Sequence, residues 1–325
     1  MNKMNFDDFK NYVVENIGEY LTDDYLGADM SISNVTRSNG YSYDALAIRK
    51  AEDADSGIVP VLDMNAAFRE YEEGMPVDDC MKTLAHIRMD APIPDGVNRN
   101  SLMSFDSTKA LVFPRLVNFA NNAEYLKDKP YKQVEDLAVL YAVRVHSDSD
   151  GFGEAVIDNR LMELWGVDEE QIHATALENL SNQEPVFINL ETAMFDVLGN
   201  EDNPKFDLEN MDASDYSVPF FLLSNRQKVS GAVMALNAKV MNRITEKFGD
   251  VYVIPSSIHE VLVVPQSFGI DPDELAEMVR SVNNEAVEPH DRLSDNVYSY
   301  DADNQTLTVV SGEQVEGEKA EIEMK

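Results

Sequence analysis

Two segments near the middle of the chain, residues 110–118 and 137–146, are dense in β-branched and aromatic residues. Such residues favour the pleated, half-buried surface of a sheet, so both segments predict strands of a core sheet. Segments of helical periodicity lie before and after them, and no internal repeat of fixed period is visible. This order predicts an α+β fold with a mixed, largely antiparallel central sheet flanked by helices.

The chain opens with a helical pattern over residues 5–21, where apolar residues recur at intervals of three and four. Two β-prone segments follow, 30–37 and 41–50, on either side of Asn39-Gly40. Asn-Gly favours a tight hairpin turn because both residues tolerate positive φ. The sequence therefore predicts an N-terminal helix followed by a β-hairpin.

Residues 63–73 and 76–89 show helical periodicity and predict a helical pair. A stretch rich in Pro and Asn, residues 90–100, follows as a loop and marks a soft boundary. From residue 311 onward the chain is poor in apolar residues and charged, which predicts a disordered tail. The expected domains are an N-terminal unit over 1–95, a sheet domain over 96–310 and an acidic tail over 311–325.

Most of the central sheet is expected from four regions: 110–118, 137–157, 220–236 and 251–264. Within the third region, residues 232–236 read as a short strand, and residues 148–151 (DSDG) read as a hairpin turn within the second. Helices are expected over 159–165, 168–181, 238–248 and 271–284.

The chain carries 60 acidic and 26 basic residues, a formal net charge of −34. This charge repels phosphate backbones and anionic lipid surfaces, so neither nucleic acid nor a membrane is expected as a partner. The simplest interpretation of the acidity is solubility. The alternative is an acidic surface that imitates DNA and inhibits a basic DNA-binding protein.

A single cysteine, Cys80, excludes an internal disulfide and fits a reducing compartment. The N-terminal residues lack the cationic and apolar regions of a signal peptide, and no apolar run approaches the ~20 residues of a spanning helix. We therefore expect a cytoplasmic protein.

The segment Ser256-Ser257-Ile258-His259-Glu260 combines hydroxyls, an imidazole and a carboxylate, the residue types of nucleophile, base and orienting group. In a strand Ser257 and His259 share a face, whereas Glu260 points the other way. No triad forms from these neighbours alone. Ser257, His259 and Glu260 remain candidates if distant residues complete a site, and a solvated polar turn is the alternative.

Arg115, Arg144 and Lys109 lie in or beside the predicted sheet of an otherwise acidic chain. A basic side chain within an apolar strand normally has a dedicated carboxylate partner. The alternative is a cleft where these cations bind an anionic ligand, which makes Arg115 a further candidate site residue.

Motifs for cofactors and metals are missing from the sequence. There is no glycine-rich dinucleotide or P-loop motif, and the five histidines include no pair at metalloprotease spacing. The acidic turn at residues 148–159 lacks the glycine and glutamate positions of an EF-hand calcium loop. We therefore expect no cofactor and no metal site.

Three strings, together with the opening helix that ends near Tyr20-Leu21, resemble an uncharacterised family of bacterial cytosolic proteins. The strings are residues 161–167 (LMELWGV), 254–261 (IPSSIHEV) and 293–298 (LSDNVY). This domain of unknown function is abundant in gut anaerobes and often travels with mobile genetic elements. The resemblance covers nearly the whole chain and implies no established activity, cofactor or catalytic residue.

A more remote resemblance runs from Val112-Phe113-Pro114-Arg115 through the hairpin at 137–157 to residues 176–180 (ALENL). This succession is similar to the YtpQ-type uncharacterised proteins of bacilli, and it likewise implies a fold without a mechanism.

The leading functional hypothesis is a non-catalytic protein-interaction or accessory protein, because no constellation in the sequence supplies nucleophile, base and stabiliser together. The alternatives are an enzyme or small-ligand binder with a site near Ser257, His259 and Arg115, and an acidic DNA mimic. An unidentified protein partner is expected under the first hypothesis.

Overall fold

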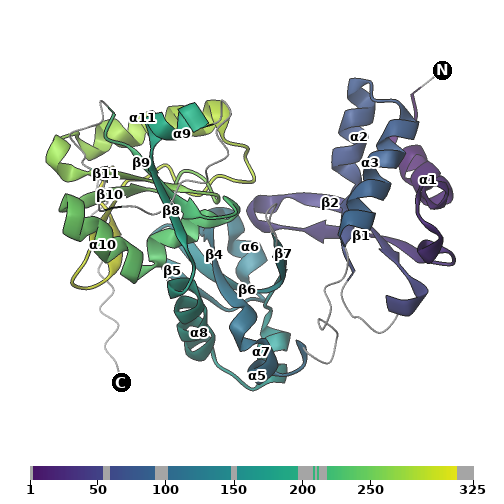
Figure 1. Ribbon diagram of the computed structural model, residues 1–325, viewed down its shortest axis with the longest axis horizontal. Helices are drawn as coiled ribbons and strands as arrows, with labels where there is room; N and C mark the ends of the chain where they lie inside the picture. Colours follow the sequence, from purple (N-terminus) through teal and green to yellow (C-terminus); the bar gives the residue numbers. More distant parts are fainter. Residues whose placement is uncertain are drawn as a thin grey trace.

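The computed structural model describes residues 3–53, 59–91, 102–147, 152–196, 208, 211 and 218–312. The helices α1, α2 and α3, all from the first 90 residues, lie together at one end of the molecule, on the right in Figure 1. We call the described residues up to 91 the N-terminal lobe and the remainder the body. The predicted boundary at 95/96, the turn at 148–151 and tail residues 313–325 lie outside the described residues.

The described part of the N-terminal lobe consists of a small antiparallel sheet, in the order β1-β2-β3, covered by helices. Its elements are α1 (Phe6–Asn16), β1 (Asp29–Thr36), β2 (Ser42–Arg49), β3 (Val61–Asp63), α2 (Met64–Glu73) and α3 (Val77–Asp90). Short 3-10 turns lie between them: η1 (Ile17–Tyr20), η2 (Asp23–Tyr25), η3 (Ser38–Gly40) and η4 (Ala51–Asp53). The predicted hairpin and helical pair are confirmed.

The helices of the lobe end where their sequences favour other conformations. The side chain of Asn5 accepts a hydrogen bond from the Asp8 amide at the start of α1. The predicted helix over 5–21 is shorter than expected, because the chain continues from Asn16 as the 3-10 turn η1. Asn16 and Gly18 both disfavour the helix interior, and the Asn16 side chain donates from Nδ2 back to the Tyr12 carbonyl.

The body contains two antiparallel sheets. The four-stranded sheet has the order β4-β6-β5, with β7 also paired to β6, and the six-stranded sheet has the order β13-β12-β10-β11-β9-β8. The strands are β4 (Val112–Asn118), β5 (Tyr131–Val134), β6 (Leu137–Ser147), β7 (Phe152–Val156), β8 (Pro185–Asn189), β9 (Phe221–Asn225), β10 (Val251–Ile254), β11 (Val261–Pro265), β12 (Tyr298–Asp301) and β13 (Thr306–Val309).

The predicted α+β class is confirmed, and two details of the predicted sheet are corrected. The regions expected to share one central sheet are divided between the two sheets of the body. Every pairing among the described strands is antiparallel, so the mixed character is not found there. Sheet membership depends on long-range pairing, which local periodicity does not encode.

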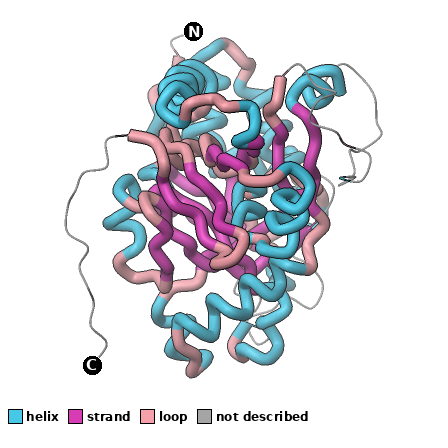
Figure 2. The backbone as a smooth tube through the Cα atoms, turned by 90° about the vertical axis from the view of Figure 1, so that its left-hand side faces the viewer, coloured by secondary structure: helices cyan, strands magenta, loops and turns pink. Residues whose placement is uncertain are grey.

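Helices surround the strands of the body (Figure 2). They are α5 (Phe105–Thr108), α6 (Ala123–Leu126), α7 (Asn159–Trp165), α8 (Glu169–Ser181), α9 (Leu190–Asp196), α10 (Ala238–Phe248) and α11 (Pro272–Ala286), with 3-10 turns η5 (Lys109–Leu111), η6 (Ala120–Asn122), η9 (Gly231–Leu236) and η10 (Gln266–Phe268). No helix among the described residues is long and apolar enough to cross a membrane.

The largest hydrophobic cluster takes side chains from both sheets of the body. Alternate residues of β6, such as Val139 and Tyr141, share this cluster with residues of the six-stranded sheet, of α8 and of α10. A separate cluster lies in the N-terminal lobe and contains only residues between Met4 and Met89. The lobe therefore has a hydrophobic core of its own.

Residues 232–236 were predicted as a strand, and this prediction is wrong. They form the buried 3-10 turn η9, in which the Ala232 amide donates to the Ile258 carbonyl. A Cβ on the preceding Gly231 would lie 2.5 Å from the His259 carbonyl oxygen and 2.1 Å from Ser224 Oγ. Such a short apolar run fits a buried strand and a buried helical turn equally well, and this close packing decides between them.

The tip of the β1–β2 hairpin connects the N-terminal lobe to the body. Asn39 and Gly40 at the tip have φ values of 58° and 70°, as the Asn-Gly turn predicts. Asn39 Nδ2 donates to the carbonyls of His290 (2.8 Å) and Arg292 (2.9 Å). Its Oδ1 accepts from Nδ2 of the buried Asn122 at 2.6 Å. The turn residue therefore also fixes the hairpin to the body.

Candidate functional site

The predicted polar segment around His259 forms the connection between β10 and β11. Ser257 pairs with Arg292 in an isolated antiparallel bridge, and the Ile258 amide donates to the Asp291 carbonyl. These backbone contacts bring His259 beside Asp291, a residue that the sequence did not single out. The connection is therefore ordered by a distant segment of the chain.

The ring nitrogens of His259 are arranged differently from those of a catalytic histidine. Nε2 lies 3.4 Å from Asp291 Oδ2, and Nδ1 is buried. In a triad, one nitrogen faces the carboxylate and the other faces the nucleophile. The nearby Ser257 hydroxyl is itself buried and accepts a hydrogen bond from the His259 backbone amide at 3.0 Å. Ser257 and His259 lie close together but do not form a nucleophile–base pair.

The third residue of this segment, Glu260, has a perturbed carboxyl group. Burial raises the pKa of Glu260 above its ordinary value, and the neighbouring His259 and Ser257 oppose this rise. For His259, the hydrogen bond to Asp291 raises the pKa of the imidazole, against the effect of burial. Burial acts to raise the pKa of Asp291, but its hydrogen bond to His259 lowers it overall.

These shifts predict how stability depends on pH. The folded-state pKa of His259 lies above its ordinary value of 6.5, so its contribution is present below pH 6.5 and is lost as the pH rises through the folded-state pKa. We expect the free energy of unfolding to fall more, or to rise less, from pH 6 to pH 8 in the wild type than in the variant His259→Gln. His173, whose pKa is lowered by burial, acts in the opposite direction in both proteins. Urea unfolding of both proteins across this range measures the difference. An unchanged pH dependence in His259→Gln would contradict the assignment.

Arg115 lies away from His259. Arg115 pairs with Leu140, and both lie on the face of the four-stranded sheet where Leu140 and Val117 belong to a small hydrophobic cluster. Ile258, next to His259, packs against the large hydrophobic cluster on the opposite face of that sheet. The Arg115 Nε atom lies 3.4 Å from Glu154 Oε2. The structure therefore does not bring Arg115 and His259 into one site.

The basic residues around Arg115 have carboxylate neighbours. The other oxygen of Glu154 lies 3.4 Å from Arg144 Nη2, so this one carboxylate faces two guanidinium groups. Lys109 contacts Asp106 at 3.0 Å. Among the residues that the structure describes, no group of three His, Cys, Asp or Glu side chains is placed to hold a metal ion.

An apolar groove lies in the N-terminal lobe between α2, α3 and β3, with a volume of about 260 Å³. Residues 80, 83, 84 and 87 line it from one face of α3, in keeping with helical spacing. Its other lining residues are Val61, Leu62, Asp63, Ala66, Ala67 and Glu70. Ile87 is 52% exposed and Val61 is 38% exposed, so the groove presents aliphatic side chains to solvent.

Carboxylates border this groove. Burial raises the pKa of the Cys80 thiol at the groove, and the nearby charges of Glu70 and Asp79 raise it further. Asp63 also lines the groove, but its oxygens accept from the Ala66 amide and the Tyr41 hydroxyl. Glu70 is exposed at the surface. The groove therefore combines an apolar floor with an acidic border.

Comparison with known proteins identifies the family. A family model described as "Family of unknown function (DUF5688)" matches residues 6–302. The chain belongs to the DUF5688 family. The match covers the N-terminal lobe and nearly all of the described body, so the two parts are combined in the family itself. Searches of curated proteins and of solved structures gave no match.

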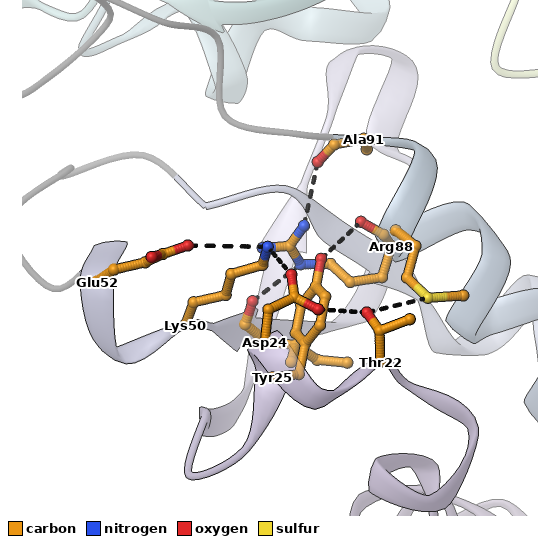
Figure 3. A network of polar contacts seen from close by, with 9 residues as sticks. Thr22, Asp24, Tyr25, Lys50, Glu52, Arg88 and Ala91 are labelled. Atoms are coloured by element: carbon orange, nitrogen blue, oxygen red, sulfur yellow. Dashed lines mark hydrogen bonds and ion pairs between the residues drawn. The ribbon is translucent and has the colours of Figure 1, made fainter.

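In this DUF5688 chain, a buried arginine anchors the end of α3 (Figure 3). Arg88 is 1% exposed, and it donates from Nε to the Ile48 carbonyl at 2.9 Å and from Nη1 to the Ala91 carbonyl at 3.1 Å. Its guanidinium carbon lies 5.0 Å from the centre of the Tyr25 ring, which also faces Lys50 Nζ at 4.5 Å. The Nη2 atom is buried and has no hydrogen-bond partner among the described residues.

This anchor fixes one wall of the groove. Arg88 ties the last turn of α3 to β2, and the groove residues Leu84 and Ile87 lie within about one helical turn of it. Lys50, which also lies over the Tyr25 ring, bonds to Asp24, which also accepts from Thr22 (Figure 3). This wall of the groove is therefore tied by hydrogen bonds to the sheet of the lobe.

The sequence did not predict the groove, because the groove is recognised by the solvent exposure of its apolar side chains. Helical periodicity places Ile87 on α3 next to core residues such as Leu84, so it looks like part of the core stripe. The structure shows that this stripe is wider than the surface that α2 covers. The sequence signal that could have indicated the groove is an apolar stripe on α3 that is broader than one packed helix can cover.

Proposed function

We propose that this protein is a non-catalytic binding protein that captures a partner protein through the groove between α2 and α3. The observation that carries the proposal is the exposed aliphatic pair Val61 and Ile87 on an apolar groove with carboxylates at its border. Exposed apolar patches bordered by polar residues are typical of interaction sites. A groove between two helices suits an amphipathic segment of a partner.

Charge decides which segment fits. The groove carries Glu70 and Asp63 at its border, in a chain with a net charge of −34. A basic partner is attracted to such a surface and an acidic one is repelled, which acts mainly on specificity and association rate. The proposed ligand is therefore an amphipathic helix with one or two aliphatic anchor residues flanked by lysine or arginine.

The expected energy comes mostly from the anchors. Fully burying an aliphatic side chain contributes about 1.5–3 kcal/mol, and Ile87 and Val61 still expose about half and a third of their surface. Covering both therefore contributes on the order of 2 kcal/mol before the partner's own anchors are counted. Ile87 is the larger contributor, so its replacement by a charge is the most informative change.

A designed peptide tests the proposal. An amphipathic peptide of leucine and lysine, about 18 residues long, is titrated with the protein by fluorescence anisotropy. We expect saturable binding that weakens with added salt, and a loss of affinity of about tenfold or more in Ile87→Glu, because the new carboxylate must be desolvated in the apolar groove. A peptide with serine in place of leucine keeps the charge and should not bind.

The matched control is Met278→Glu. Met278 lies on α11 in the body and is 52% exposed, the same fraction as Ile87. The control variant adds the same charge far along the chain from the groove and should bind the peptide as the wild type does. Equal affinity of the wild type and Ile87→Glu, or equal loss in both variants, would show that the groove is not the binding site.

We propose that the protein is soluble and acts in the bacterial cytoplasm, in line with its single cysteine and its strong acidity. An accessory role in gut anaerobes, in association with mobile elements, and a distant relation to YtpQ-type proteins are proposed from the sequence motifs alone.

A further inference from the structure

A second pocket in the N-terminal lobe has a different character from the groove. It has a volume of about 310 Å³ and is lined by Phe6, Tyr41, Asn65, Phe68 and Arg69. Phe6 begins α1, Tyr41 directly precedes β2, and the other three residues belong to α2. On α2, positions 65, 68 and 69 belong to a different side of the helix from groove positions 66, 67 and 70.

Three aromatic rings line this pocket. The Phe6 and Phe68 rings lie 5.1 Å apart, tilted by 47°. The Tyr41 ring also packs against Tyr43 at 5.5 Å and His290 at 5.2 Å, so it contacts the body as well as the lobe. Aromatic walls of this kind favour a planar ring, which can pack face or edge against them.

The polar groups of the pocket are donors. Asn65 Oδ1 accepts from the Asp44 amide at 2.8 Å, which leaves Nδ2 as the donor of this side chain. Arg69 is exposed, and among the described residues no carboxylate lies within ion-pair distance of its guanidinium. Two acidic residues that contact pocket residues are already engaged: Asp44 bonds to Lys10 at 2.6 Å, and Asp63 accepts from the Tyr41 hydroxyl at 2.6 Å.

We propose that this pocket binds a small aromatic carboxylate. The ring of the ligand packs among Phe6, Phe68 and Tyr41, and its carboxylate pairs with the Arg69 guanidinium. Arginine is suited to this role because its planar fork matches the two oxygens of a carboxylate. A volume near the lower limit for small-molecule sites restricts the ligand to one or two rings. This inference is independent of the groove and of its protein partner.

Benzoate is the test ligand, titrated into the full-length protein by isothermal calorimetry. We expect saturable binding with a dissociation constant of about 1 mM or below, which is the range for a ligand of this size. Benzamide has the same ring without the charge and should bind at least about tenfold more weakly. Arg69→Gln should weaken benzoate by a similar factor and leave benzamide unchanged.

Two controls keep the outcome decisive. Arg160→Gln removes an exposed arginine of α7, in the body, and should leave benzoate affinity unchanged. The circular dichroism spectrum of Arg69→Gln should match that of the wild type, since Arg69 is a surface residue. No saturable binding to the wild type, or equal benzoate affinity in the wild type and Arg69→Gln, would overturn the proposal.

Discussion

Replacing Gly231 by alanine is expected to lower the free energy of unfolding by about 3 kcal/mol or more. The added Cβ would lie 2.5 Å from the His259 carbonyl oxygen and 2.8 Å from the Asn225 amide nitrogen. Both are backbone atoms in the centre of the body, so they cannot move aside as a flexible side chain would. Chemical denaturation of Gly231→Ala and wild type at pH 7 measures the difference.

Gly18→Ala is the control for this prediction. Nothing lies within 4 Å of a Cβ at Gly18, which sits in η1 on the N-terminal lobe. Alanine there should be neutral, or stabilising by about 0.4–1 kcal/mol through the unfolded chain. A Gly231→Ala protein as stable as Gly18→Ala would mean that η9 does not approach β9 and the β10–β11 connection as closely as described.

The second large effect is expected at Arg88. Arg88→Ala should destabilise the protein by about 3 kcal/mol, because it opens a cavity and leaves the Ile48 carbonyl without its donor. Thermal or urea unfolding measures this loss. The change also frees the end of α3, so amide hydrogen exchange in the last turn of that helix should accelerate.

Arg88→Met separates packing from charge. Methionine keeps the volume of the stem and brings no charge into the interior, so it should cost at least about 1 kcal/mol less than alanine. The guanidinium has no carboxylate partner among the described residues, and its Nη2 lacks a hydrogen bond. If the free energy of unfolding of Arg88→Ala falls by less than about 1 kcal/mol, the contacts of Arg88 in Figure 3 contribute little to stability.

Much of the secondary structure follows from local sequence. The density of β-branched and aromatic residues predicts β4 and β6, and Asn39-Gly40 predicts the hairpin turn with its positive φ values. Strand β5 (Tyr131–Val134) escapes prediction because it is four residues long and contains Lys132 and Gln133. Pairing with β6 makes it a strand, and that pairing lies outside any local window.

The candidate site is less predictable than the fold. The sequence draws attention to His259 and Ser257, yet Asp291, which fixes the imidazole, lies 32 residues further along the chain and is brought close by backbone contacts. Arg115 likewise depends on Glu154 from another strand. Such partners become visible only once the strands are paired, because side-chain identity does not specify register at a distance.

The groove between α2 and α3 also depends on tertiary contacts that the sequence does not specify. Hydrophobic periodicity shows which residues of α3 lie on one stripe, but the part of the stripe left uncovered depends on how far α2 extends across it. Ile87 and Leu84 are both apolar residues of that stripe, and one is 52% exposed while the other is 3% exposed. The periodicity of α3 alone therefore does not locate the binding surface.

The most direct measurement is alkylation of a cysteine placed in the groove. In Ile87→Cys the new thiol is exposed, whereas the native Cys80 is buried with a raised pKa and reacts slowly. Saturation with the leucine–lysine peptide should slow iodoacetamide labelling of Ile87→Cys by about tenfold or more, and labelling of Met278→Cys by less than about twofold. Equal rates with and without peptide at Ile87→Cys would contradict a partner site between α2 and α3.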